Sequence, residues 1–473
     1  MVFSSYNFIL FFLVVYAGYS ITRRFMGLAA CKIWIVAASL FFYGHGNIAY
    51  LPLLVGTTVF NYAASAIMSR YKSMSKIKNL VFAAAIAENL GFLIFFKYTD
   101  FLIYNINRVA GSGFLPFKTA LPLGISFFTF QILIYIIGVY RDKTTHGSFL
   151  DFTFFVTFFP KLIVGPIMRY DDMERQLRGG NLLSFDSGNA IKGLMLFSFG
   201  CAKKVLIADA MISHAQGFYD TALSGGHFFS AWIGVAAYTF AFYFDFSGYI
   251  DMALGLACLF NIELPVNFNS PYKARDFADF WRRWNITISK FFNDYVFSGI
   301  FKFGDRAGKL IAAVMLTFLV SGVWHGAGWN FIFWGLVNGL FVCIANLMTL
   351  RRIKLPAFPA WLLTFLMVML TRVLFDSSNM TQALHVYRLM FDIRPVFTDG
   401  AAFLGLGAGF FSANIRTLLL ILVSALICFF PKNSNEIVRE NKSKWYHAAL
   451  CGGLLCLSLF FMSGVSNFLY FQF

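Results

Sequence analysis

Long apolar runs separated by short polar stretches follow one another along the whole chain. Runs near twenty residues are long enough to cross a hydrocarbon layer of about 30 Å as helices. These runs are continuous rather than alternating, which argues against a transmembrane β-barrel. The pattern predicts an all-α polytopic membrane protein with about eleven to thirteen transmembrane or re-entrant helices. The expected apolar helices lie near residues 8–15, 31–43, 49–68, 79–104, 121–140, 190–215, 229–260, 309–323, 328–349, 360–375, 402–430 and 446–471.

Polar residues interrupt two of the early runs. Residues 152–168 contain two prolines and a lysine, which predicts either a re-entrant or broken helix or a kinked ordinary span. Glu88 and Lys97 lie within the run at 79–104, where a charge costs roughly 2.5–3.5 kcal/mol unless it is paired or hydrated. We therefore expect these two charges to form a pair or to line a cavity.

The longest polar interruption covers residues 261–307, followed by apolar sequence. Within it, residues 275–295 place apolar side chains at 277, 281, 284, 288, 291 and 295, the spacing of one helical face. This predicts an amphipathic helix lying along the membrane interface, with its arginines toward water. Asn285 falls at the edge of the apolar face, so its polar side chain is expected to point inward.

Composition supports a membrane protein, because 59% of the 473 residues are hydrophobic and only 13% are charged. The net charge of +16 is scattered among loops such as 23–24, 70–78, 141–143 and 351–354. Scattered loop charge is typical of cytoplasmic loops rather than of nucleic-acid binding. Because Arg23 and Arg24 follow the first apolar run and no basic residue precedes it, we expect an uncleaved first helix with an extracytoplasmic N-terminus.

Several kinds of site are not indicated. The seven cysteines are dispersed and mostly lie in apolar runs, so neither disulfides nor a metal site is expected. No Walker loop, His-Glu-x-x-His or Gly-x-Ser-x-Gly sequence occurs. No internal repeat suggests a transporter built from two halves.

The polar residues set deepest in apolar sequence gather in residues 244–334, which we regard as the signature core of the chain. His325 sits between Trp324 and Gly326 at the junction of two apolar runs. A histidine in such a run is more often structural than catalytic. Glycines at 322, 326 and 328 favour catalysis, since they let backbone or substrate approach the imidazole closely. A neutral imidazole there would be a general base contributing about 10² to 10⁴ in rate.

These motifs, taken in order, resemble the membrane-bound O-acyltransferase family, and within it the bacterial branch of alginate and peptidoglycan O-acetylation. The core motifs are FDFSGYID at 244–251, NFNSPY at 267–272, FWRRW at 280–284 and GVWHG at 322–326. Earlier motifs agree, namely MVFSS at 1–5, LPLGIS at 121–126, FPKLIVGP at 159–166 and KKVLIAD at 203–209. The similarity spans nearly the whole chain, which we therefore treat as one integral-membrane domain, 1–473.

The resemblance implies a helical fold around a central tunnel in which a cytosolic acyl donor meets an extracytoplasmic acceptor. His325 matches the family's catalytic histidine, and Asn285 matches the second signature position. Polysaccharide-modifying relatives usually carry histidine at that second position, so the asparagine of this chain departs from their pattern. Candidate substrate-binding residues are Trp324, Trp281, Arg282, Arg283, Asp245, Ser247, Tyr249 and Asp251. The two arginines would either hold donor phosphates or anchor the chain to the cytoplasmic face, and residues 245–251 would either line the cavity or join helices by hydrogen bonds.

The resemblance further implies acetyl transfer from acetyl-CoA, or another acyl thioester, to a cell-envelope glycan such as peptidoglycan, alginate or another exopolysaccharide. No tightly bound cofactor or metal is expected. A periplasmic O-acetyltransferase partner protein would complete the transfer, and the chain would lie in the cytoplasmic (inner) membrane. D-alanyl transfer to teichoic acid is the alternative within the family. A channel or transporter for lipid-linked sugars, or a noncatalytic scaffold, is the alternative outside it.

Overall fold

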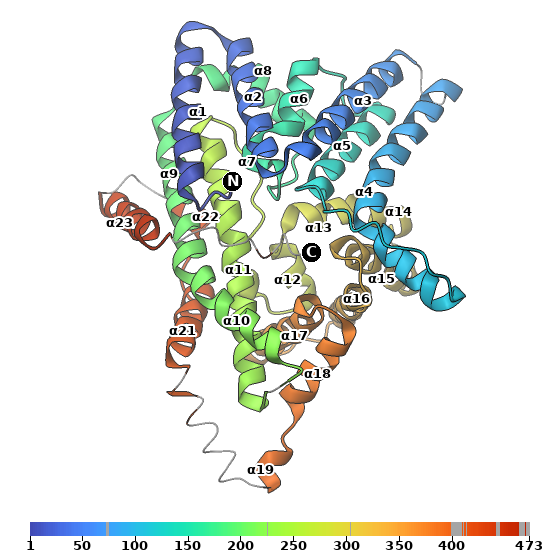
Figure 1. Cartoon of the computed structure of the whole chain (residues 1–473), viewed down its shortest axis with the longest axis vertical. Helices are drawn as coiled ribbons and strands as arrows, with labels where there is room; N and C mark the ends of the chain where they lie inside the picture. The colour runs from blue at the N-terminus through green and yellow to red at the C-terminus, as the bar shows by residue number, and fades with distance from the viewer. Residues whose placement is uncertain are drawn as a thin grey trace. The chain divides into compact units, whose positions relative to one another are not determined.

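A computed structural model describes residues 1–71, 75–224, 226–302, 304–398, 409, 411–412, 414–440, 445–462 and 469. The described residues form helices joined by turns and loops, without a β-strand among them (Figure 1). They divide into two compact units, described separately below. Of the described residues, unit 1 comprises those within 1–198 and 249–265 together with 462, and unit 2 comprises those within 199–248 and 266–461 together with 469. The expectation of a single domain, and of a tunnel within it, stays a prediction.

Unit 1 begins with four long apolar helices that match the predicted runs closely. Its helices are α1 (Tyr6–Phe25), α2 (Leu28–Gly46), α3 (Leu51–Arg70), α4 (Lys76–Ala110), α5 (Ile125–Tyr140), α6 (Phe149–Thr157), α7 (Phe159–Leu162), α8 (Tyr170–Arg178) and most of α9 (Ser187–Cys201). The segment 152–168 is a broken helix, as one alternative predicted: α6 ends, α7 adds one turn with Pro160 near its start, and irregular backbone follows.

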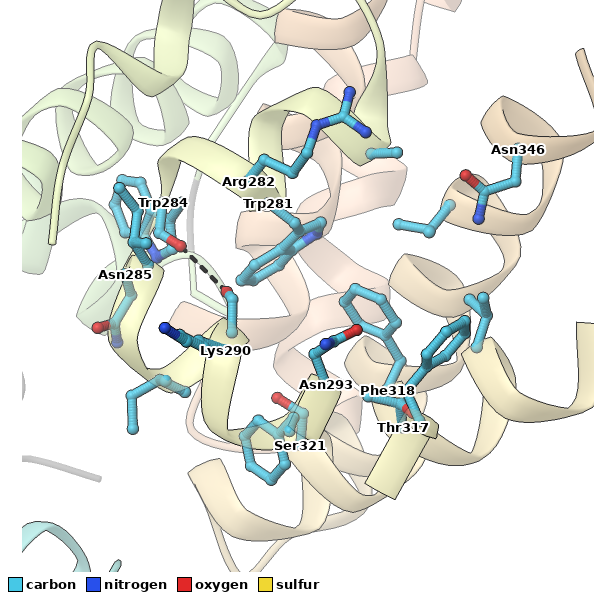
Figure 2. Close-up of a pocket in the computed structure, with 18 of the residues that line it drawn as sticks. Trp281, Arg282, Trp284, Asn285, Lys290, Asn293, Thr317, Phe318, Ser321 and Asn346 are labelled. Carbon is cyan, nitrogen blue, oxygen red and sulfur yellow. Dashed lines mark hydrogen bonds between the residues drawn. The ribbon is translucent and has the colours of Figure 1, made fainter. Parts of the chain in front are cut away.

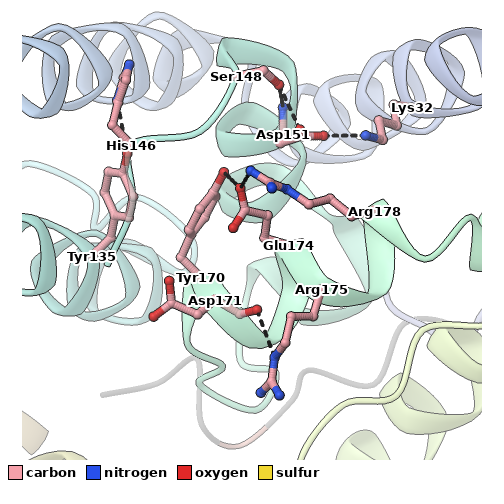
Figure 3. Close-up of polar contacts among 10 residues, drawn as sticks. All are labelled: Lys32, Tyr135, His146, Ser148, Asp151, Tyr170, Asp171, Glu174, Arg175 and Arg178. Carbon is pink, nitrogen blue, oxygen red and sulfur yellow. Dashed lines mark hydrogen bonds and ion pairs between the residues drawn. The ribbon is translucent and has the colours of Figure 1, made fainter. Parts of the chain in front are cut away.

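Charged groups inside unit 1 are satisfied locally. Glu88 accepts hydrogen bonds from the hydroxyl of Thr57 (2.8 Å) and the side-chain amide of Asn61 (3.0 Å). Figure 3 shows a second network, in which Lys32 of α2 binds Asp151 of α6. On α8 the buried carboxylate of Glu174 is bound by Arg178 at 2.8 Å. These contacts support a structural role for Glu88, while the role expected of Lys97 stays a prediction.

Unit 2 carries the signature motifs. After the π-helical turn at Ala202–Ala208 its helices are α10 (Asp209–Thr221), the first part of α11 (Phe228–Leu259), α12 (Phe277–Arg283), α13 (Ile286–Phe292), α14 (Ser298–Ile300), α15 (Ala307–His325), α16 (Trp329–Leu350), α17 (Ala357–Asp376), α18 (Met380–Phe391), α19 (Arg394–Thr398), α21 (Ile415–Phe429), α22 (Ser434–Glu440) and α23 (Trp445–Phe461). The single helix predicted over 275–295 is wrong, because Asn285 separates α12 from α13.

Among the described residues, seven helices are long and apolar enough to cross a membrane, or eight if the bent pair α21–α22 is one span. This is fewer than the eleven to thirteen expected, a count that included re-entrant and broken pieces. The predicted span 190–215 is divided at its lysines into α9, the π-helical turn and α10. Residues 402–408, 410 and 413 of the expected span 402–430 lie outside the described residues.

The helices α15 and α16 form a tightly packed hairpin joined by a short turn. A Cβ atom added at Gly322 would lie 2.5 Å from the carbonyl oxygen of Phe331 and 3.1 Å from Cα of Gly335. Glycine is thus required by the close approach of the two backbones. The turn of this hairpin presents His325, which is the last residue of α15.

Candidate active site

The corner between α12 and α13 positions Asn285. Its backbone is left-handed, with φ 44° and ψ 56°, a conformation that asparagine tolerates better than most residues. Asn267 holds the corner by accepting the backbone N–H of Ile286 (3.0 Å) on its carbonyl and that of Thr287 (3.2 Å) on its side chain. The corner therefore turns the Asn285 side chain, which is only 3% exposed, into the protein.

His325 lies in a cage of aromatic rings. Its ring centroid is 4.5 Å from that of Trp324, 4.8 Å from that of Trp334 and 5.1 Å from that of Phe375, all with the planes steeply inclined. The imidazole is buried. Rings from α15, α16 and α17 thus restrict the orientation of the imidazole, which a general base requires.

A cavity of about 580 Å³ adjoins both residues. Its walls come from α12, α13, the π-helical turn that follows, α15 and α16 (Figure 2). The indole of Trp281 reaches toward Phe318 of α15, and their ring centroids are 5.4 Å apart. Arg282 and Lys290 add positive charge to walls that are otherwise largely apolar. A cavity of this size accommodates a small-molecule substrate or an extended arm of a larger one.

A second, much smaller chamber of about 30 Å³ lies within the same unit. Four residues line both spaces: Trp281, Trp284, Asn285 and His325. Within the described part of the chain, neither Oδ1 of Asn285 nor Nε1 of Trp281 has a hydrogen-bond partner, although both atoms are buried. Buried polar atoms left in this state at a cavity wall are suited to binding a substrate.

The comparison with known families decides the class of protein. Residues 58–375 match the model of the MBOAT, membrane-bound O-acyltransferase family, and this range includes both Asn285 and His325. The chain belongs to the membrane-bound O-acyltransferase family. It is accordingly a multi-pass membrane enzyme of the acyltransferase class.

Individual relatives show which members of the O-acyltransferase family the chain resembles. It is 37% identical to the peptidoglycan O-acetyltransferase of Helicobacter pylori, over 93% of this chain and 91% of that protein. It is 34% identical to the probable alginate O-acetylase AlgI of Pseudomonas aeruginosa, over 83% of this chain and 75% of that protein. A teichoic acid D-alanyltransferase of Streptococcus thermophilus is 33% identical but matches only 47% of this chain.

The structure brings part of the predicted O-acyltransferase site together. Asn285, His325, Trp281 and Arg282 line the large cavity, and Trp324 packs against the His325 ring. Arg283, in contrast, does not line either cavity. Its guanidinium binds the carboxylate of Asp279 at 2.9 Å, one helical turn earlier in α12.

The predicted residues of the 244–251 motif do not line the two cavities. Asp245 is ion-paired with Lys204 at 2.7 Å and accepts the backbone N–H of Leu469 at 2.9 Å. Ser247 is buried on the same helix. Tyr249 and Asp251 belong to unit 1, where the Tyr249 ring stacks on Phe3 at 4.7 Å. These contacts favour the structural alternative over substrate binding.

Three residues near His325 were not singled out from the sequence. Trp334 and Phe375 form the cage, and Arg372 lines the small chamber. A signal did exist for Arg372, since an arginine inside the apolar run 360–375 must be satisfied by partners. Its guanidinium binds Asp376, one helical turn further along α17.

Proposed function

We propose that this O-acyltransferase moves an acetyl group from a cytoplasmic thioester, acetyl-CoA, to a hydroxyl of a cell-envelope polysaccharide. The observation that carries the proposal is the placement of His325 and Asn285 on one wall shared by two cavities. The likeness to peptidoglycan and alginate acetylating proteins supports the acceptor class.

In the proposed reaction, His325 removes the proton from the attacking hydroxyl as its oxygen bonds to the thioester carbonyl carbon. The side-chain N–H of Asn285 donates to the developing oxyanion without carrying a charge itself. The indole N–H of Trp281, which has no hydrogen-bond partner among the described residues, lies on the same wall and donates to the same oxygen. When the C–S bond breaks, His325 returns its proton to the leaving thiolate. The imidazole is therefore neutral both before and after the reaction.

The shape of the large cavity supports donor entry from the cytoplasm. On α15 the lining residues extend from His325 back to Val314, a distance of about 16 Å along a helix. On α16 the lining extends to Asn346, near the end of that helix. The open end of this helix hairpin is basic, with Arg306, Lys309, Arg351, Arg352 and Lys354. By the positive-inside rule that end faces the cytoplasm, where anionic acetyl-CoA is found.

The negative charge of one acidic residue at the same end, Asp305, is compensated by neighbouring groups. The pKa of the Asp305 carboxyl is held below its usual range, first by the backbone N–H of Lys302 and then by the ammonium of Lys309. Asp305 therefore stays ionised and paired with Lys309. It offsets one positive charge and leaves the other cations of this end to attract the donor phosphates.

In this proposal the chain lies in the cytoplasmic (inner) membrane with an extracytoplasmic N-terminus, and a periplasmic partner protein places the acetyl group on the polymer. Support for the orientation comes from the basic loops. The partner is supported by the family resemblance alone.

The decisive experiment measures acetate released by alkali from purified peptidoglycan and, separately, from exopolysaccharide. Cells would carry the wild type, His325→Ala, the matched control His385→Ala or no copy; His385 lies on α18 and lines neither cavity. We expect acetate to fall in one fraction with His325→Ala and without the gene, but not with His385→Ala. Unchanged acetate in the strain without the gene would contradict the proposal and favour the transporter alternative.

A second candidate, D-alanyl transfer to teichoic acid, is favoured by the partial match to D-alanyltransferases. The same alkaline extracts distinguish the two, because D-alanyl esters release alanine in place of acetate. Loss of alanine with acetate unchanged would select this candidate.

A further inference from the structure

The small chamber beside His325 is closed on the side away from the large cavity by α17 and α11. Val368, Thr371 and Arg372 come from α17, and Phe242 and Phe246 come from α11. The guanidinium of Arg372 lies 3.7 Å from the ring centroid of Phe242 and 4.6 Å from that of Phe375. These walls are densely packed, so the chamber has little freedom to widen.

The two substituents of a thioester carbonyl, the sulfur arm and the acyl group, can each be assigned to one of the two cavities. Its carbonyl carbon must meet the base and the oxyanion donor, and His325 and Asn285 lie on the wall common to both spaces. The sulfur arm of the donor is long, so only the cavity of about 580 Å³ can hold it. The acyl substituent projects from the other side of the carbonyl carbon, toward the chamber of about 30 Å³.

We propose that the small chamber is the acyl pocket of this enzyme and that its walls limit the transferred group to two carbons. This rests on the proposed function and adds to it the selectivity for the acyl group. A water-sized group needs roughly 10–15 Å³ of such space, so the chamber has room for two of them. The methyl group and carbonyl oxygen of acetyl fill that room, whereas propionyl adds a methylene group.

Two residues of α17 allow the chamber to be enlarged in small steps. Val368 is 3% exposed and borders the chamber but not the large cavity. Thr371 also borders it, and its hydroxyl donates to the carbonyl of Val368 at 3.0 Å. Val368→Ala removes two methyl groups, while Thr371→Ser removes one methyl group and keeps the hydroxyl for this hydrogen bond. Val373→Ala is the matched control, because Val373 is equally buried on α17 but lines neither cavity.

The test uses membranes from cells that make the full chain, with the periplasmic fraction and the cell-envelope glycan retained, supplied with equal concentrations of radiolabelled acetyl-CoA and propionyl-CoA. Label released by alkali from the glycan fraction gives the ratio of propionate to acetate. One added methylene changes selectivity by about 10- to 200-fold in a fitted pocket, so we expect a wild-type ratio of about 0.1 or less. Val368→Ala should raise it by about three-fold or more, Thr371→Ser should raise it less, and Val373→Ala should leave it unchanged.

The two proposals fail in different ways. If wild-type membranes incorporate acetate in a His325-dependent way but accept propionyl-CoA equally well, the acyl-pocket proposal is wrong and the acetyl-transfer proposal stands. The acyl-pocket proposal alone is also wrong if Val368→Ala and Thr371→Ser incorporate acetate with an unchanged ratio of propionate to acetate. If acetyl-CoA gives no His325-dependent label at all, the proposed donor chemistry itself is wrong.

Discussion

The imidazole of His325 meets the indole of Trp334 edge-on, with ring centroids 4.8 Å apart and planes inclined by 80°. Trp334 also packs against Phe375 at 5.2 Å, so one indole supports both the base and another ring of its cage. Trp281 contacts the same indole at 5.6 Å. Trp334 thereby connects the residues that line the reacting wall.

Trp334→Ala should therefore slow the reaction without removing any reacting group. A base displaced by about 1 Å can lose about 100-fold in rate, so we expect acetate incorporation to fall by about 10- to 100-fold. Trp329→Ala on the same helix is the control, because Trp329 is exposed and borders neither cavity. Equal effects of the two substitutions at equal protein levels would argue against a positioning role for Trp334.

Asn285 combines a backbone role with a chemical one, and substitutions separate them. Asn285→Gly keeps the left-handed corner accessible but removes the amide donor, so the protein should fold normally and lose about 10²- to 10³-fold in kcat. Asn285→Ala loses the donor too and adds backbone strain of about 1–2 kcal/mol. Acetate incorporation and thermal unfolding of the purified protein would be measured together. Wild-type activity of Asn285→Gly would exclude the amide from the reaction.

The same corner shows what the sequence could and could not predict. Apolar residues at helical spacing continue through 275–295, so periodicity predicts one helix across the break. The break depends on hydrogen bonds that the backbone N–H groups of Ile286 and Thr287 donate to Asn267, a residue outside that segment. A contact made only in the folded chain is invisible to a local pattern. The long apolar helices were predictable because their length and composition are local properties.

The residues of the active site likewise fall into those that the sequence could indicate and those that it could not. His325 and Asn285 could be named because motif order resembles a known family, although this resemblance says little about their surroundings. The cage residue Phe375 and the chamber residue Val368 lie on α17, which looks like an ordinary apolar span. Their role arises from which face of α17 is turned toward α15 and α16, and that depends on packing among all three helices.

Arg372 and Asp376 form an almost completely buried ion pair, with side chains 9% and 0% exposed. Removing one partner leaves an uncompensated buried charge, which typically costs about 3–5 kcal/mol. We therefore expect Arg372→Met to lower the unfolding temperature strongly. The double substitution Arg372→Met with Asp376→Leu should restore most of the stability, because no charge then remains buried. Thermal unfolding of the purified proteins tests this, and a double variant no more stable than Arg372→Met would contradict it.

Two glycines of α15, Gly322 and Gly308, allow a matched test of how closely α15 must pack against α16. An alanine Cβ at Gly322 would lie 2.5 Å from the Phe331 carbonyl oxygen, so α15 and α16 would have to separate. At Gly308, on the same helix, no atom outside the neighbouring backbone lies within 4 Å of an added Cβ. Gly322→Ala should therefore lower the unfolding temperature and the activity together, because His325 ends the displaced helix. Gly308→Ala, at the second residue of α15, should leave both the activity and the unfolding temperature close to those of the wild type. A Gly322→Ala protein that unfolds like the wild type but cannot incorporate acetate would instead indicate that Gly322 borders the substrate.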